Sequence, residues 1–267
     1  MNGSEAALRI NVLADNNAGT LYRAEHGLSF LIEASGKKIL FDSGQSDLFI
    51  KNAGSMDLNL ADCDIMIMSH GHFDHGNGFR FLKSGKLLCH PGCFSGRYRK
   101  KDHTYIGLSG NREVYTGKFD LICSSGPYLI SDRIWYLGAI PRMTEFESRT
   151  TDFIFRDGSE DFVDDDSALA VILDTGLFVI TGCGHAGIVN TLEHARKVTG
   201  ISRISGIMGG FHLKEQNRQL DETISYLLEA GVRHVIPCHC TQFPAMCAFY
   251  ENFFNSPVRT GDRLQIN

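Results

Sequence analysis

Short apolar segments alternate with glycine-containing turns along the chain and predict a series of strands. Two pairs of neighbouring segments are separated by only two or three turn residues, Ser35-Gly36 and Asp174-Thr175-Gly176, so each pair predicts a β-hairpin. Most segments are apolar at consecutive positions, which is typical of strands covered on both faces. The expected strands are residues 8–14, 30–34, 38–42, 65–68, 168–173, 177–180 and 234–237, a segment that ends at Gly209, and a short one near Leu264.

Segments with helical spacing follow several of these strands. The apolar positions of residues 220–230 fall on one side of a helix, and a glycine ends it. Further helices are expected at 190–197 and 243–253, and another begins near Phe79. Because strands and helices alternate four times and a hairpin opens each half, the chain is predicted to be an α/β (α+β) protein.

Composition limits the classes of protein that this chain can represent. With 267 residues and 43% hydrophobic content, residues 1–267 can bury a core as a single domain. A net charge of -5 argues against a nucleic-acid partner, and no apolar run approaches the ~20 residues that would cross a membrane. Residues 1–9 show no secretory signal, so a cytoplasmic location and reduced cysteines are expected. The oligomeric state is left open.

The hydrophobic pattern loosens at about residues 92–166. We interpret this range as a lid-like insertion that covers a pocket. Basic and aromatic residues gather in it, and Arg97 and Tyr98 are candidate contacts for a small-molecule substrate that is phosphorylated or flat-ringed. An ordinary solvated surface is the alternative for any one of these residues.

Residues that could bind a metal ion follow directly after the expected strand that ends at Met68. Within six residues the chain carries His70, His72, Asp74 and His75. Imidazole nitrogens and carboxylate oxygens are ligands that suit Zn²⁺, Mn²⁺ and Fe. A polar loop with solvated histidines is the alternative, but packing gives no reason to crowd so many titratable groups.

Three more histidines follow strand ends in the second half. His185 lies after the second hairpin, His212 follows two glycines, and His239 stands at the tip of a strand. Chemistry in α/β folds is concentrated at such strand ends. We therefore expect His212 in a pocket, either as a ligand or as a hydrogen-bond donor to a substrate oxyanion.

Three cysteines lie within two residues of these histidines. Cys183, Cys238 and Cys240 are expected to be small buried residues at tight strand ends. Since Cys238 and Cys240 flank His239 on an extended segment, their side chains should point away from it.

The motif His-x-His-x-Asp-His at residues 70–75 resembles the signature of the metallo-β-lactamase superfamily. This resemblance implies a four-layer αββα sandwich with metal ligands on loops at one edge of both sheets. It implies a first ion at His70, His72 and His185, and a second at Asp74, His75 and His239. Asp42 stands where the superfamily has an aspartate that orients the ligands, although a turn aspartate that bonds its own backbone is the alternative.

The sequence departs from the superfamily where an aspartate usually bridges two metals. No aspartate stands between Gly200 and Leu220. One or two divalent ions are therefore expected, with zinc preferred over manganese, iron or magnesium. His212 could replace the missing bridge as a terminal ligand, and Asp74 could act as base and orienter if only one ion binds.

Five motifs resemble a narrower branch, the 7,8-dihydropterin-6-methyl-4-(β-D-ribofuranosyl)-aminobenzene-5′-phosphate synthases. They comprise residues 41–46, 69–76, 182–185, 209–213 and 237–241. This resemblance implies a substrate that combines a flat ring and an anion. Thr241, in the last motif, and His26, in a loop expected over the site mouth, are further candidate substrate contacts.

Three functions follow from these expectations. The first is a metal-dependent hydrolase that uses a metal-activated water on a phosphodiester or related ester, with Asp74 and His212 as catalytic residues. The second is a transferase that joins a pterin diphosphate to a ribofuranosylaminobenzene phosphate. The third is an iron-binding redox protein, which lacks a recognisable electron partner in the sequence.

Overall fold

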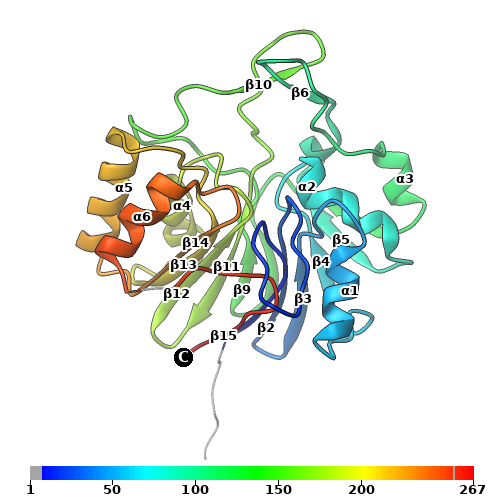
Figure 1. The fold of residues 1–267 in the computed structure, drawn as a ribbon, viewed down its shortest axis with the longest axis horizontal. Helices are drawn as coiled ribbons and strands as arrows, with labels where there is room; N and C mark the ends of the chain where they lie inside the picture. Colours follow the sequence, from blue (N-terminus) through cyan, green and yellow to red (C-terminus); the bar gives the residue numbers. More distant parts are fainter. Residues whose placement is uncertain (1–7, 255) are drawn as a thin grey trace, which may run out of the picture.

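Two β-sheets pack face to face, and helices cover the outer face of each (Figure 1). The computed structural model describes residues 8–254 and 256–267, so most of the N-terminal stretch in which no secretory signal was found lies outside the described residues. The layers follow the order helix, sheet, sheet, helix. This confirms the αββα sandwich expected from the sequence.

The first sheet has seven strands in the order β15-β1-β2-β3-β4-β5-β7. Its first four strands are antiparallel, whereas β3, β4, β5 and β7 run parallel. The strands are β1 (Leu8–Ala14), β2 (Ser29–Ala34), β3 (Lys37–Phe41), β4 (Ile65–Ile67), β5 (Lys86–Cys89), β7 (Asp120–Cys123) and β15 (Arg263–Ile266).

The second sheet has six strands in the order β14-β13-β12-β11-β9-β8. The strands β12, β13 and β14 are parallel, and the others are antiparallel. They are β8 (Tyr128–Ser131), β9 (Ile134–Tyr136), β11 (Ala168–Leu173), β12 (Gly176–Thr181), β13 (Ile204–Gly210) and β14 (His234–Cys238).

Three apolar cores hold the layers together. The central core lies between the sheets and joins side chains such as Phe30 and Phe41 to Phe178 and Met208. A second core packs α4 (Ile188–Thr199), α5 (Arg218–Glu229) and α6 (Phe243–Asn252) on the six-stranded sheet. A third packs α1 (Leu48–Ser55) and the turn η1 (Asn77–Phe81) on the seven-stranded sheet. Because both faces of each sheet are covered, the strands are apolar at consecutive positions, as the sequence pattern indicated.

The predicted helices differ from the observed ones mainly at their ends. The helix expected near Phe79 begins earlier, as the short α2 (Phe73–Gly76), and continues as η1. The helix α1 was not predicted, and neither were the strands β5, β7, β8 and β9. No described helix is both long and apolar enough to cross a membrane.

The range 92–166, for which the sequence predicted a lid-like insertion, is only partly such a segment. Its strands β7, β8 and β9 belong to the two main sheets, because their apolar side chains pack into the sandwich. Only a two-stranded ribbon of β6 (Arg97–Arg99) and β10 (Phe153–Phe155) stands beyond the sheets, at the top of Figure 1. The range also contains η2 (Pro91–Phe94) and α3 (Arg112–Thr116).

The parallel strands bring distant parts of the sequence to one edge of the sandwich. The strands β3 and β4 of one sheet, and β12, β13 and β14 of the other, end at this edge. Carboxyl ends of parallel strands are where α/β proteins place their binding sites. The loops that follow these strands carry the histidines selected from the sequence.

Candidate metal centre

His70, His72 and His185 form a first group of nitrogen donors. His70 and His72 follow β4, and His185 follows β12. Nε2 of His70 lies 3.0 Å from Nδ1 of His72, and each of the three rings offers a nitrogen within 4.8 Å of the others. Two nitrogens bound tetrahedrally to one zinc ion lie about 3.3 Å apart. The group therefore has the spacing of three ligands of one ion.

Asp74, His75 and His239 form a second group beside the first. Nε2 of His75 lies 3.1 Å from Nε2 of His239, and Oδ2 of Asp74 lies 3.5 Å from the same His239 nitrogen. His75 also lies next to His70, with ring centroids 4.2 Å apart. The structure thus brings together the two triads that the sequence resemblance implied.

Asp42 fixes ligands of both groups. Its Oδ2 accepts hydrogen bonds from Nδ1 of His75 and from Oγ of Ser69, both at 2.7 Å, and its Oδ1 accepts from the Ser69 amide. The Ser69 hydroxyl in turn lies 2.9 Å from Nδ1 of His70. Carboxylates in this position set the tautomer and the orientation of metal-binding histidines. The contacts place Asp42 in the orienting position that the sequence suggested.

A glycine permits this close packing between the sheets. At Gly182, just before the His185 loop, a Cβ atom would lie 2.0 Å from Oγ of Ser69. Any side chain at this position would therefore displace the Ser69 hydroxyl that supports His70.

Two residues that directly follow β1 support His239, and neither was selected from the sequence. Oδ2 of Asp15 accepts a hydrogen bond from the His239 amide at 3.0 Å. Oδ1 of Asn16 lies 3.1 Å from Nδ1 of His239, and its Nδ2 donates to the His239 carbonyl. The polar residues that follow the predicted strand 8–14 were the only sequence signal for this role.

Arg97 lies in the interior and does not reach the pocket surface, which corrects its expected role as a substrate contact. Its guanidinium pairs with Asp165 at 2.8 Å and with Asp161 at 3.3 Å, and all three side chains are buried. The other oxygen of Asp165 accepts a hydrogen bond from the amide of Gly71, between His70 and His72. A buried carboxylate needs a partner charge. Arg97 therefore supports, through Asp165, the loop that carries His70 and His72, which we call the metal loop.

Burial keeps the first group of histidines neutral. It lowers the pKa of His70 and of His185 well below the ordinary value, and the positive charges of neighbouring histidines add to the shift. Burial also lowers the pKa of His72 to about 3, with the Arg97 guanidinium as the next cause. Neutral imidazole is the form that binds metal ions.

In the second group, the pKa values of Asp74 and His75 shift toward the charged forms. Burial opposes ionisation of Asp74, but the nearby charge of His75 and hydrogen bonds from His239 and His26 hold the pKa of this carboxyl well below its usual range. Burial likewise opposes protonation of His75, yet the Asp42 and Asp74 carboxylates raise its pKa. Asp74 therefore offers an ionised oxygen to a cation.

Unpaired buried atoms show that this donor set fits a divalent ion. Nε2 of His72 and Nε2 of His185 are buried and have no hydrogen-bond partner among the described residues. An unsatisfied buried polar atom costs about 1–3 kcal/mol. A cation bound between the rings would satisfy both nitrogens.

His212 and His185 line a cavity of about 180 Å³. Their ring centroids lie 4.3 Å apart, and Nδ1 of His212 has no hydrogen-bond partner among the described residues. The cavity wall also carries Phe153, Arg149 and Lys214. His212 thus lies in the pocket, as expected, with a nitrogen available to a ligand.

The other expected substrate contacts are placed differently from one another. His26 borders the centre, since its Nε2 lies 3.1 Å from Oδ2 of Asp74 and its side chain is 58% exposed. Tyr98 packs on Tyr105 and is not among the described residues that line the cavity. Thr241 is buried, and its Oγ1 accepts a hydrogen bond from the Phe211 amide. Its hydroxyl therefore holds the turn at Phe211, and Thr241 is not among the described residues that line the cavity, which does not match its expected role as a substrate contact.

Two cysteines lie closer to the centre than expected. Sγ of Cys183 lies 3.1 Å from Nε2 of His75. Cys240, expected to point away from His239, has its Sγ within 4.8 Å of ligand atoms of both His239 and Cys183. The extended geometry assumed for residues 238–240 fails because His239 adopts left-handed backbone, with φ 53°.

Comparisons with known proteins identify relatives of this chain. The metallo-β-lactamase superfamily profile matches residues 22–86. An uncharacterized protein of Methanocaldococcus jannaschii is 34% identical over 89% of this chain and 92% of its own. The 7,8-dihydropterin-6-methyl-4-(β-D-ribofuranosyl)-aminobenzene-5′-phosphate synthase of the same organism is 30% identical over 92% of both chains. The chain belongs to the metallo-β-lactamase superfamily.

Solved structures of the superfamily share the whole sandwich. The crystal structure of a metal-dependent hydrolase of the β-lactamase superfamily is 29% identical, with a TM-score of 0.86 over 97% of this chain and 99% of that one. The metallo-β-lactamase fold protein YhfI of Bacillus subtilis has a TM-score of 0.57 at 14% identity, over 98% and 100% of the two chains. The second likeness concerns the fold alone.

Proposed function

We propose that the protein is a metal-dependent hydrolase that cleaves a phosphodiester or related ester in a small-molecule substrate, with zinc as the preferred metal. The observation that carries this proposal is the convergence of His70, His72 and His185 with Asp74, His75 and His239 beside a cavity. The similarity to a metal-dependent hydrolase at 29% identity supports it.

The roles of the residues follow from their contacts. A divalent ion held by the two triads would supply Lewis acidity and lower the pKa of water to about 7. Asp74, ionised and within 3.1 Å of His26, can accept a proton or orient the attacking water. His212, whose Nδ1 has no partner among the described residues, can donate a hydrogen bond to the oxygen on which charge develops.

The cavity suits an anionic substrate that carries a ring. Arg149 and Lys214 place positive charge on its wall, although Lys214 also pairs with Asp152. Phe153 and Phe162 add aromatic surface. Cations of this kind bind phosphate oxygens, and aromatic faces pack on flat rings.

Activity against a model diester tests the proposal. Chelator-treated protein should be inactive on bis(p-nitrophenyl) phosphate and regain activity with Zn²⁺. His72→Ala should lose at least ~100-fold in kcat/KM, because it removes a ligand. His234→Ala is the matched control, since His234 lies at the start of β14, far along the strand from the centre. Full activity after chelation, or in His72→Ala, would refute the proposal.

A transferase that joins a pterin diphosphate to a ribofuranosylaminobenzene phosphate is the second candidate. The 30% identity to the archaeal synthase over 92% of both chains favours it. The same centre would then stabilise a leaving diphosphate. Coupled product from these two substrates, without cleavage of the model diester, would favour the synthase. The iron content and colour of the purified protein would identify an iron-based redox protein.

A further inference from the structure

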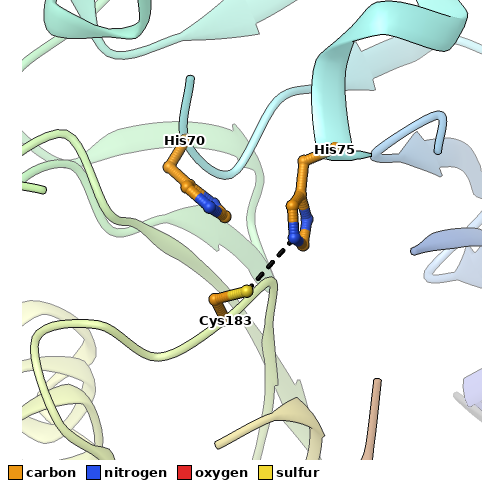
Figure 2. A group of neighbouring side chains, drawn as sticks. All are labelled: His70, His75 and Cys183. Carbon is orange, nitrogen blue, oxygen red and sulfur yellow. Dashed lines mark hydrogen bonds between the residues drawn. The ribbon is translucent and has the colours of Figure 1, made fainter. Parts of the chain in front are cut away.

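A cysteine lies between the two groups of expected ligands. Cys183 follows β12, two residues before His185, and is buried. Figure 2 shows its sulfur facing His75 and His70, and Sγ lies 3.1 Å from Nε2 of His75. The thiol thus points into the metal centre and not into an apolar core.

Cys183 has donors of both triads within reach. Its Sγ lies within 4.8 Å of the ligand atoms of His70 and His75 in one combination, and of His185 and His212 in another. His239 and Cys240 complete a third combination with the same sulfur. The carboxylate of Asp74, in contrast, belongs to a single combination. Among the described residues, the sulfur of Cys183 occurs in more of these combinations than any other donor.

The surrounding atoms indicate that this sulfur is a ligand. A thiol that only fills space needs no polar neighbours, yet Nε2 of His75 lies 3.1 Å from Sγ, and His185, which shares a donor combination with Sγ, has a buried Nε2 without a partner among the described residues. The backbone also fixes the position of Sγ. Gly182 packs on the Ser69 hydroxyl, and Gly184 has a φ of 62°, which side-chain-bearing residues rarely adopt.

We propose that the Cys183 thiolate is a ligand shared by two divalent ions, one held by His70, His72 and His185 and the other by Asp74, His75 and His239. The inference rests on the proposed function in one respect, namely that the protein binds metal. On coordination the thiol releases its proton to solvent, and sulfur donates an electron pair to each ion. A soft sulfur donor favours zinc, cobalt or iron over magnesium and manganese.

Cobalt-substituted protein tests this directly. Chelator-treated wild type, Cys183→Ser, Cys183→Ala and a Cys247→Ser control are loaded with Co²⁺, desalted, and measured for cobalt per chain and for near-ultraviolet absorption. Cys247 lies on α6 and belongs to none of the donor combinations among the described residues. The circular dichroism of each metal-free variant reports whether it folds.

Wild type and Cys247→Ser should hold two ions per chain and show thiolate-to-cobalt charge transfer. Both Cys183 variants should lose this band, and the second ion should bind at least ~10-fold more weakly. A folded Cys183→Ser protein that keeps the band and both ions would overturn the inference but leave the hydrolase proposal standing. One ion per wild-type chain would overturn the sharing of the ligand. A charge-transfer band that depends on Cys183, in a protein that does not hydrolyse the diester, would instead contradict the proposed function and leave this inference standing.

Discussion

At the scale of single residues, the metal centre uses strained backbone. Asp42, His212 and His239 have φ of 57°, 50° and 53°, in the left-handed region that favours glycine. Such a conformation costs about 1–3 kcal/mol per residue and persists only where surrounding contacts hold it. All three residues follow strands that run parallel to a neighbour; the Asp42 and His239 side chains contact His75, and His212 lines the cavity.

Asp42→Asn should weaken metal binding without unfolding the protein. The amide preserves the shape of the side chain, but its nitrogen cannot accept the hydrogen bonds that Oδ2 receives from His75 and Ser69. We expect a loss of about 10–100-fold in zinc affinity, measured by competition with a chromogenic chelator. Asp102→Asn, at an exposed carboxylate paired with Arg99, is the control. Equal affinities in the two variants would contradict the orienting role of Asp42.

At the scale of elements, the ribbon of β6 and β10 is tied to the metal loop by charge. Arg97 on β6 pairs with Asp165, and Asp165 holds the Gly71 amide in the middle of the His70 loop. The loop before β11 also contributes Asp166, whose Oδ2 accepts from the Ala186 amide. Asp165 and Asp166, in a segment with few helical or strand signals, thereby hold the His70 loop and the His185 loop in place.

Arg97→Met should reduce stability more than it affects substrate binding. Removing the guanidinium leaves the buried carboxylates of Asp161 and Asp165 without their partner, which costs about 3–5 kcal/mol in the free energy of unfolding. Arg99→Met, two residues away and exposed, should leave the free energy of unfolding nearly unchanged. Urea unfolding measures both. A raised KM with unchanged stability in Arg97→Met would restore its role as a substrate contact.

At the scale of the whole molecule, the two sheets meet at a cluster of neutral histidines. The first triad comes from both halves of the chain, so it exists only when the sandwich is assembled. Titration of these rings is therefore coupled to folding.

The metal-free protein should lose stability as the pH falls below 6.5. The folded-state pKa values of His70, His72 and His185 lie below the ordinary 6.5. Below that pH, these histidines therefore bind protons in the unfolded chain but not in the folded protein. His75, with a raised pKa, partly offsets the loss. The contribution of each of these three histidines to the slope is at most about 1.4 kcal/mol per pH unit, in the range where the unfolded chain is protonated and the folded centre is not.

Thermal unfolding of chelator-treated protein at pH 7.5 and 5.5 measures this slope. His72→Ala should show a shallower dependence, because one of the three depressed groups is gone. A stability that stays level or increases toward pH 5.5 would show that the triad is not buried in the neutral form.

The strands β5 to β10 were not predicted. The sequence by itself determined the order of the other strands and of the helices α4, α5 and α6, and most of the expected donor residues. Both follow from short-range patterns: apolar runs, turn glycines, and a motif of four donors within residues 70–75. A histidine that follows a strand end is equally local, and this pattern selected His185, His212 and His239. Helix ends and the short helix α1 were less well predicted, because tertiary packing decides where a helix frays.

Tertiary structure decided which side chains support the donors and which cysteine joins them. The Gly71–Asp165 bond spans 94 residues, the contact of Cys183 with His75 spans 108, and the bond from Asp15 to His239 spans 224. No periodicity encodes such partners, because they depend on the stacking of two sheets whose strands are far apart in sequence. For the same reason a basic residue that the sequence placed on a lid, Arg97, lies buried behind the metal loop.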